Sequence, residues 1–113
     1  MKRVAVTGLG VISPVGNDVE TFWSALCAGT CGIGPITKFD ATDYPVKLAA
    51  EVREFDPRQY MEKLDILHSD VYTHFAMAAA CQSMDDRGIA GAVNEERIGV
   101  YIGSGIGGIA TFM

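Results

Sequence analysis

Residues 97–113 read RIGVYIGSGIGGIATFM, and this stretch decides the fold that we expect for the chain. Residues 98–102 form a short apolar run that is rich in β-branched and aromatic side chains and is bounded by glycine. Such a run predicts a strand buried on both faces, as in a sheet covered by helices. Four glycines follow within residues 103–108, and glycine lets a ligand or another backbone approach closely. Open α/β sheets often place ligand sites where a strand meets such a turn, so this loop is a candidate site.

The remaining chain alternates predicted strands and helices, which defines an α/β fold class. Residues 3–7 (RVAVT) and 47–52 (KLAAEV) predict two further short strands. Residues 30–44 are expected to be irregular because Gly32, Gly34 and Pro35 interrupt them.

Three features predict helices. Asn17, followed three residues later by Glu20, is a predicted N-cap for an apolar helical stripe (Val19, Phe22, Trp23, Leu26 and Cys27) that ends at Gly29. Asp56-Pro57 is a helix-start signal, after which residues 58–67 form a short helix or an irregular segment. A longer helix is expected after Ser69 or Asp70 and ends at Gly88, with Phe75 buried and several alanines allowing close packing.

Composition limits the possible functions. A chain of 113 residues with 49% hydrophobic and 20% charged residues can form one globular core. The net charge of −5, with no cluster of Lys or Arg, argues against nucleic acid as a partner. No apolar run is long enough to cross a bilayer and no signal peptide is recognisable, so we expect no membrane association. The expected location is the cytoplasm, with an organelle reached by means of a removed presequence as the alternative.

The cysteines and histidines do not form a recognisable metal or catalytic pattern. Cys27, Cys31 and Cys81 have no CxxC spacing and are interpreted as free thiols, with Cys27 as a small core residue. No His lies beside Cys31 in sequence, so a nucleophilic role is not expected. His68 and His74 are interpreted as surface or interface residues, and no metal or cofactor is expected. Asp85, Asp86, Asn94, Glu95 and Glu96 are expected to form a solvated acidic edge.

Two glycine patterns suggest a dinucleotide-binding site as an alternative. Gly8-Leu9-Gly10 follows a predicted strand, but Ser13 occupies the place of the third glycine and Pro14 precedes any helix, so a structural turn is favoured. Gly103, Gly105 and Gly108 do fit G-x-G-x-x-G after a strand. That alternative requires a helix directly afterwards and an acidic residue about twenty residues further on.

Three stretches together carry a resemblance to a known family. They read RVAVTGLGVISPVGNDVETFWSALCAGTCGI, ITKFDATDYPVKLAAEVREFDPRQYM and RIGVYIGSGIGG. The chain resembles, over almost its whole length, the N-terminal part of a β-ketoacyl-acyl carrier protein synthase of the type II, elongating kind. The resemblance implies the N-terminal half of a thiolase-like fold with five layers, in a homodimer.

The same resemblance implies an activity, namely the decarboxylative condensation of an acyl group with malonyl-acyl carrier protein in fatty acid elongation. The catalytic cysteine, two histidines and lysine of the family match no residue of this chain, which is expected to be an incomplete domain covering residues 1–113. Ile106 matches a bulky apolar position at the acyl pocket of elongating synthases, and Gly105 and Gly107 beside it give the loop room. These three residues are the predicted substrate-binding residues, and acyl carrier protein is the predicted partner.

Two further expectations follow. Residues 61–70 read MEKLDILHSD, where relatives carry several basic residues that could meet the acidic carrier protein, and here only Lys63 is basic. The strands at residues 3–7 and 98–102 are expected to lack sheet neighbours and to leave apolar edges open. A polyketide ketosynthase, or its non-catalytic chain-length partner, remains the alternative within the same fold.

Overall fold

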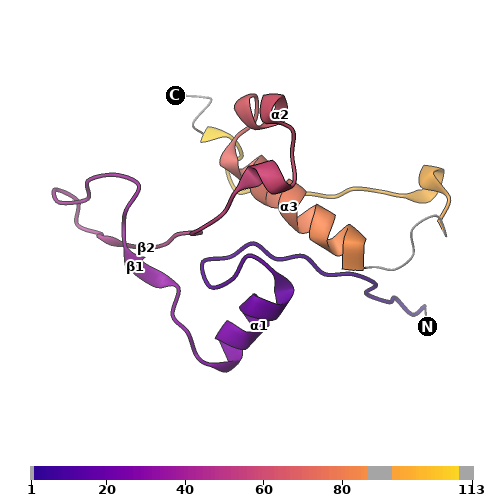
Figure 1. The fold of residues 1–113 in the computed structure, drawn as a ribbon, viewed down its shortest axis with the longest axis horizontal. Helices are drawn as coiled ribbons and strands as arrows, with labels where there is room; N and C mark the ends of the chain where they lie inside the picture. Colours follow the sequence, from indigo (N-terminus) through magenta and orange to yellow (C-terminus); the bar gives the residue numbers. More distant parts are fainter. Residues whose placement is uncertain (1, 87–92, 110–113) are drawn as a thin grey trace. The chain divides into compact units, whose positions relative to one another are not determined.

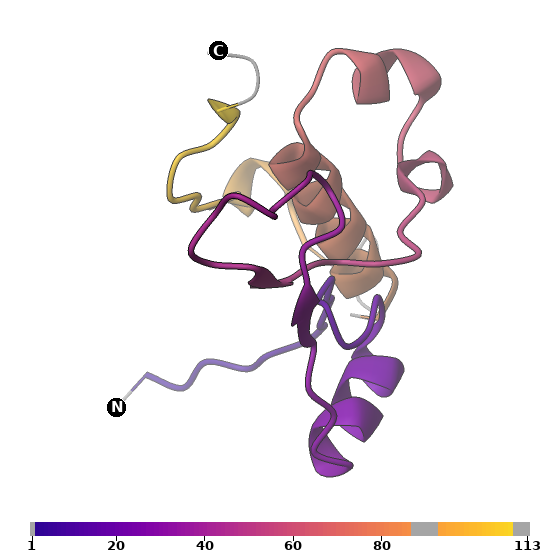
Figure 2. The ribbon, with the colours of Figure 1, turned by 90° about the vertical axis from the view of Figure 1, so that its left-hand side faces the viewer.

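The computed structural model describes residues 2–86 and 93–109, and they belong to two compact units. One unit joins Met1–Gly10 to Asp56–Met113, and the other is Val11–Phe55. Figure 1 shows the ribbon and Figure 2 shows it after a quarter turn. The described elements are the helices α1 (Val19–Cys27), α2 (Lys63–Leu67) and α3 (Val71–Asp86), the 3₁₀ helices η1 (Pro57–Gln59) and η2 (Glu95–Arg97), and the strands β1 (Ile33–Pro35) and β2 (Leu48–Ala50).

Helix α1 forms where the apolar stripe predicted it, but its cap is one residue later. Asp18, not Asn17, is the N-cap, because its carboxylate accepts the Thr21 amide at 2.7 Å. The Asn17 side chain instead donates to the Arg53 carbonyl at 2.8 Å. Gly29 ends the helix as expected, with a φ of 69° that glycine adopts without strain.

The apolar stripe of α1 is less buried than predicted. Phe22 is half-buried, whereas Trp23 is 65% exposed and Cys27 is also exposed. The interpretation of Cys27 as a core residue is therefore wrong in this structure, because no other element of the Val11–Phe55 unit covers that part of the helix.

The described sheet is a two-stranded antiparallel hairpin rather than part of a covered parallel sheet. β2 lies inside the predicted strand at residues 47–52 and pairs with β1 in the register Ile33↔Ala50, Gly34↔Ala49 and Pro35↔Leu48. The irregular segment predicted at residues 30–44 thus contains a strand that sequence reasoning missed. Pro35 is tolerated because each strand of a two-stranded sheet is an edge strand, where a missing N–H is not needed on the open side.

The predictions of strands at residues 3–7 and 98–102 are wrong for this structure. Both segments are extended but carry no strand pairing, and their side chains are open to solvent. Val4 is 94% exposed and Tyr101 is 97% exposed. A strand needs a hydrogen-bonded neighbour, and within residues 2–86 and 93–109 no segment pairs with either of them. Apolar side chains of both segments are exposed, but because neither segment is a strand, the expected open strand edges are not formed.

Helix α3 organises its own unit. It begins directly after Asp70, as expected, and the Asp70 carbonyl accepts the Thr73 amide at 2.9 Å. The predicted end at Gly88 lies outside the described residues. Ala78 is fully buried, and it is the only buried apolar residue among those described, while Phe75 is half-buried.

At Gly10 the N-terminal segment approaches α3 so closely that no side chain would fit. A Cβ on Gly10 would collide with the Ala79 carbonyl, and the Leu9 amide donates to Asp86 at 3.1 Å. These close contacts involve the backbone of α3 and do not test the expectation that its alanine side chains allow close packing. The Gly8–Gly10 segment itself is extended, and the turn lies after it, where Ser13 and Gly16 form a bridge.

None of the helices in the described part of the chain is long and apolar enough to cross a membrane.

Candidate functional site

The glycine-rich loop at residues 103–108 follows an extended segment and turns back on itself. The Ser104 hydroxyl accepts the Gly107 amide at 2.9 Å, and the Gly107 carbonyl accepts the Ile109 amide at 3.1 Å. Gly107 has a φ of 74°, a conformation that residues with a Cβ adopt only with strain. The sequence of this turn therefore requires glycine at position 107.

The three residues predicted to bind substrate lie together at the tip of this turn. Ile106 is 74% exposed, and a Cβ on Gly105 would meet no other atom within 4 Å. Residues 103–108 contain no titratable side chain. The loop can therefore contact an apolar group through Ile106 and through bare backbone, but it has no group that could transfer a proton.

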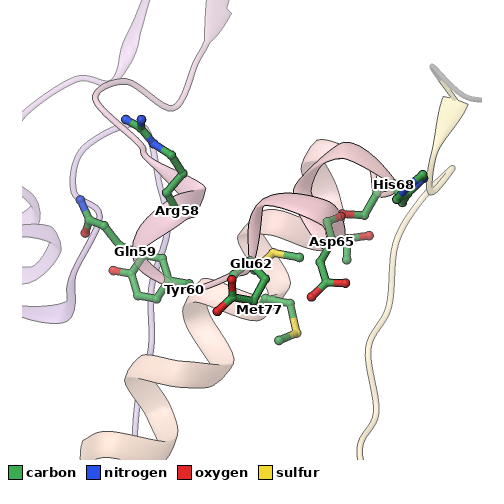
Figure 3. A pocket seen from close by; sticks show the side chains of 10 residues that line it. Arg58, Gln59, Tyr60, Glu62, Asp65, His68 and Met77 are labelled. Atoms are coloured by element: carbon green, nitrogen blue, oxygen red, sulfur yellow. The ribbon is translucent and has the colours of Figure 1, made fainter.

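A cavity of about 680 Å³ lies in the same unit, among η1, α2 and α3. Figure 3 shows Arg58, Gln59 and Tyr60 at one end of it and His68 at the other. Arg58 forms an ion pair with Asp56 at 2.7 Å, which neutralises its charge. The lining is therefore acidic, because Glu62 and Asp65 also belong to it. The side chains lining this cavity are Arg58, Gln59, Tyr60, Met61, Glu62, Asp65, His68, Ser69, Thr73 and Met77.

Hydrogen bonds hold the walls of this cavity. The Asp56 carboxylate caps η1 by accepting the Arg58 amide at 3.0 Å, which confirms the helix-start signal at Asp56-Pro57. The Arg58 guanidinium beside Asp56 holds the pKa of that carboxyl below its usual range. The Gln82 side chain of α3 donates to the Tyr60 hydroxyl at 3.2 Å and so ties the end of η1 to α3. No sequence pattern predicts this cavity, and the one signal in the region is the scarcity of basic residues in residues 61–70.

The histidines take different positions from one another. His68 is exposed, as expected, at the end of α2. His74 is only 9% exposed, so of the two positions expected for it, surface or interface, the surface position is wrong. Its imidazole Nε2 lies 3.3 Å from the Ile66 carbonyl, so the buried ring has a hydrogen-bonding partner. The same contact links α3 to α2.

The cysteines and the acidic edge form no catalytic or metal-binding arrangement in the part of the chain that the structure describes. Cys31 is exposed and Cys81 is half-buried on α3, and neither is near the glycine-rich turn in sequence. Within residues 2–86 and 93–109 no group of three His, Cys, Asp or Glu side chains is arranged to hold a metal ion. The residues of the predicted solvated acidic edge, Asp85, Asp86, Asn94, Glu95 and Glu96, are exposed.

Fold and site together define an α/β protein with an apolar, glycine-rich loop suited to binding rather than to proton transfer. The model of the family described as "Beta-ketoacyl synthase, N-terminal domain" matches residues 1–112, so the chain belongs to this family. The helix that a dinucleotide site would need after Gly108 falls almost entirely outside the described residues, but the family match removes support for that alternative.

Relatives of the chain are named as synthases of the same family. Over 109 residues the chain is 50% identical to 3-oxoacyl-[acyl-carrier-protein] synthase 2 of Coxiella burnetii, covering 96% of this chain and 26% of the relative. It is 49% identical over 111 residues to the protein of the same name from Vibrio cholerae, with the same coverage. The chain thus spans about a quarter of the length of these relatives.

A solved structure supports the fold. The chain is similar to the ishigamide ketosynthase/chain length factor, with a TM-score of 0.68 and 34% sequence identity. This similarity covers 83% of the chain and 22% of the solved one.

Proposed function

We propose that this chain is the N-terminal segment of a condensing enzyme that elongates fatty acyl groups on acyl carrier protein. The observation that carries the proposal is the family match over residues 1–112, together with relatives that are named 3-oxoacyl-[acyl-carrier-protein] synthase 2. The reaction is a decarboxylative Claisen condensation with malonyl-acyl carrier protein. A thiolase-like architecture with five layers, a homodimer and a cytoplasmic location are part of the same proposal.

Within that enzyme, residues 1–113 supply scaffold and one wall of the acyl pocket. By resemblance, the nucleophilic cysteine, the two histidines and the lysine have no counterpart among these residues, so the chain contributes no catalytic side chain. Ile106 is the residue that contacts the acyl chain, because it presents an exposed apolar side chain between Gly105 and Gly107. The bare backbone on either side lets an alkyl chain lie close to the loop.

Acyl carrier protein is the proposed partner, but the cavity beside α2 is a poor surface for it. Glu62 and Asp65 line that cavity, and Arg58 is already paired with Asp56. Like charges across an interface disfavour binding, so an acidic carrier protein would bind elsewhere on the enzyme or bind more weakly here. The polyketide alternative has one supporting observation, the similarity to the ishigamide ketosynthase/chain length factor, at a lower sequence identity than the relatives named above.

A chimera tests the proposal directly. Residues 1–112 replace the matching segment of the Coxiella burnetii relative, and condensation is measured as carrier-protein-dependent release of carbon dioxide from malonyl-acyl carrier protein. We expect an active chimera in which Ile106→Gly shifts the kcat/KM ratio toward longer acyl chains. Ile102→Gly, which removes the same side chain four residues earlier, is the matched control and leaves the ratio unchanged. A chimera with the thermal stability of its parent but no condensation would rule the proposal out.

A further inference from the structure

The glycine-rich turn approaches the start of α3 very closely at Gly108. Gly108 is half-buried, and a Cβ on it would collide with the Oδ2 atom of Asp70 and lie 2.8 Å from its Cγ. The Cβ of Asp70 itself would be at an ordinary 3.5 Å. The contact is therefore made by the carboxyl group of Asp70 against the backbone of Gly108. Figures 1 and 2 both show the yellow C-terminal segment at the end of α3 that is nearer to α2.

The other glycines of the loop have no such neighbour. A Cβ on Gly103 or Gly105 would meet nothing within 4 Å, and the same holds for Gly107, where the constraint is instead the φ of 74°. The turn that carries Ile106 is thus shaped internally by the bond between Ser104 and Gly107. The position of the turn relative to α3 is set by the adjacent residue, Gly108, which contacts Asp70.

We propose that Asp70 is a positioning residue for the acyl pocket: its carboxyl group seats Gly108 and thereby sets where Ile106 meets the acyl chain. The inference rests on the proposed function and adds to it a residue outside the loop that controls specificity. Asp70 need not touch the substrate, because displacing the loop by a fraction of the width of a methyl group changes the depth of a pocket that an alkyl chain fills.

Asp70 also precedes α3, where its backbone carbonyl accepts the amides of Thr73 and His74. A role limited to starting the helix is therefore the competing explanation. The two roles predict different effects when a substitution at Asp70 is combined with Gly108→Ala. If the carboxyl group acts through Gly108, shortening Asp70 relieves the collision that Gly108→Ala creates, whereas a helix-start role predicts that the two losses simply add.

The first test measures the contact by hydrogen exchange on the 113-residue chain. Gly108→Ala is expected to speed exchange of the amides of residues 104–109 by roughly tenfold, because overpacking of this size forces the backbone to shift. Asp70→Ala combined with Gly108→Ala is expected to restore rates near those of Asp70→Ala alone. Gly103→Ala is the matched control and changes them by less than about twofold, since its new Cβ meets open space. Equal rates in Gly108→Ala and the Gly103→Ala control would overturn the proposal.

The second test measures specificity in the chimera with the Coxiella burnetii relative. Gly108→Ala is expected to change the ratio of kcat/KM for long and short acyl chains by roughly tenfold, and the double mutant to return most of that change. A uniform loss of kcat/KM for all chain lengths would overturn the role of Asp70 while leaving the proposed function intact. A folded but inactive chimera whose exchange still responds to Gly108→Ala would overturn the proposed function and reduce Asp70 to a structural contact.

Discussion

The Thr37 hydroxyl donates a 2.6 Å hydrogen bond to Glu51 Oε2, and the Thr37 amide donates to the same carboxylate at 3.1 Å. Glu51 is only 8% exposed and directly follows β2, while Thr37 lies just beyond β1. The pair therefore ties the loop that follows β1 to the residue that follows β2, and the nearly buried carboxylate accepts hydrogen bonds from two donors.

This bond predicts how the stability of the hairpin unit depends on pH. The hydroxyl and amide of Thr37 hold the pKa of Glu51 below its usual value of 4.5. A lowered folded-state pKa means that the stabilisation is fully present above pH 4.5 and is lost as the pH falls through the folded-state value. Thr37→Val is expected to weaken the pH dependence of stability, because it removes the hydroxyl that makes the shorter of the two hydrogen bonds to Glu51.

The measurement is the urea midpoint of unfolding at about pH 6 and about pH 3, for the unsubstituted chain and for Thr37→Val. The midpoint of the unsubstituted chain should fall more steeply than that of Thr37→Val. Thr30→Val, at an exposed threonine, is the control and should keep the full acid dependence. Parallel acid dependence in all three proteins would contradict the prediction.

Gly10→Ala is expected to destabilise the unit built on α3. The new Cβ would lie 2.8 Å from the Ala79 carbonyl carbon and 3.0 Å from the Ser83 amide nitrogen, and the backbone of a helix cannot move aside easily. Overpacking of this kind costs about 1–3 kcal/mol of unfolding free energy. Denaturant unfolding of Gly10→Ala and of the control Gly103→Ala measures this loss. The unfolding free energy of the control should stay within about 0.5 kcal/mol of that of the parent.

Ser104→Ala is expected to expose the amide of Gly107. Its hydroxyl accepts that amide at 2.9 Å in an exposed turn, and a hydrogen bond of this type stabilises by about 0.5–1.5 kcal/mol. Hydrogen exchange at the Gly107 amide should therefore become faster. Ser104→Thr, which keeps the hydroxyl, should restore protection; if it exchanges as fast as Ser104→Ala, the bond is not responsible.

Thiol labelling is expected to separate the three cysteines into two classes. Cys27 and Cys31 are exposed and Cys81 is half-buried on α3. A disulfide reagent should modify the first two rapidly and Cys81 slowly, and denaturant should abolish the difference. Cys81→Ser removes the slow phase. Slow labelling of Cys27 would restore its interpretation as a core residue.

Local signals in the sequence predicted much of the secondary structure. The helical stripe before Gly29, the Asp56-Pro57 signal and the segment after Asp70 all yield helices or turns close to where they were expected. These features depend on capping and on the period of apolar residues within one segment, which a single sequence records directly.

Features that depend on distant segments were not predicted. β1 contains Gly34 and Pro35, which indicate a break, yet the segment pairs with β2 across a loop. The imidazole of His74 is buried because α2 offers the Ile66 carbonyl, and no pattern near position 74 reveals this. Similarly, residues 3–7 have the composition of a strand, but pairing depends on a neighbour that the segment itself cannot encode.

The candidate site divides in the same way. That Ile106, Gly105 and Gly107 lie in one turn follows from sequence, since glycine favours turns and is the residue that most readily adopts the positive φ found at Gly107. The approach of Gly108 to Asp70 joins positions 38 residues apart, and only the fold brings them together (108 − 70 = 38).

The exposure of Ile106 has a consequence for how such a loop can diversify. Its backbone shape depends on glycines and on Ser104, not on the side chain at position 106. A single codon change at that position therefore alters what the turn presents without disturbing how the turn is built. In the proposed acyl pocket, selection could therefore change the preferred acyl chain through one residue with little effect on folding, and a library randomised at position 106 alone would sample this variation.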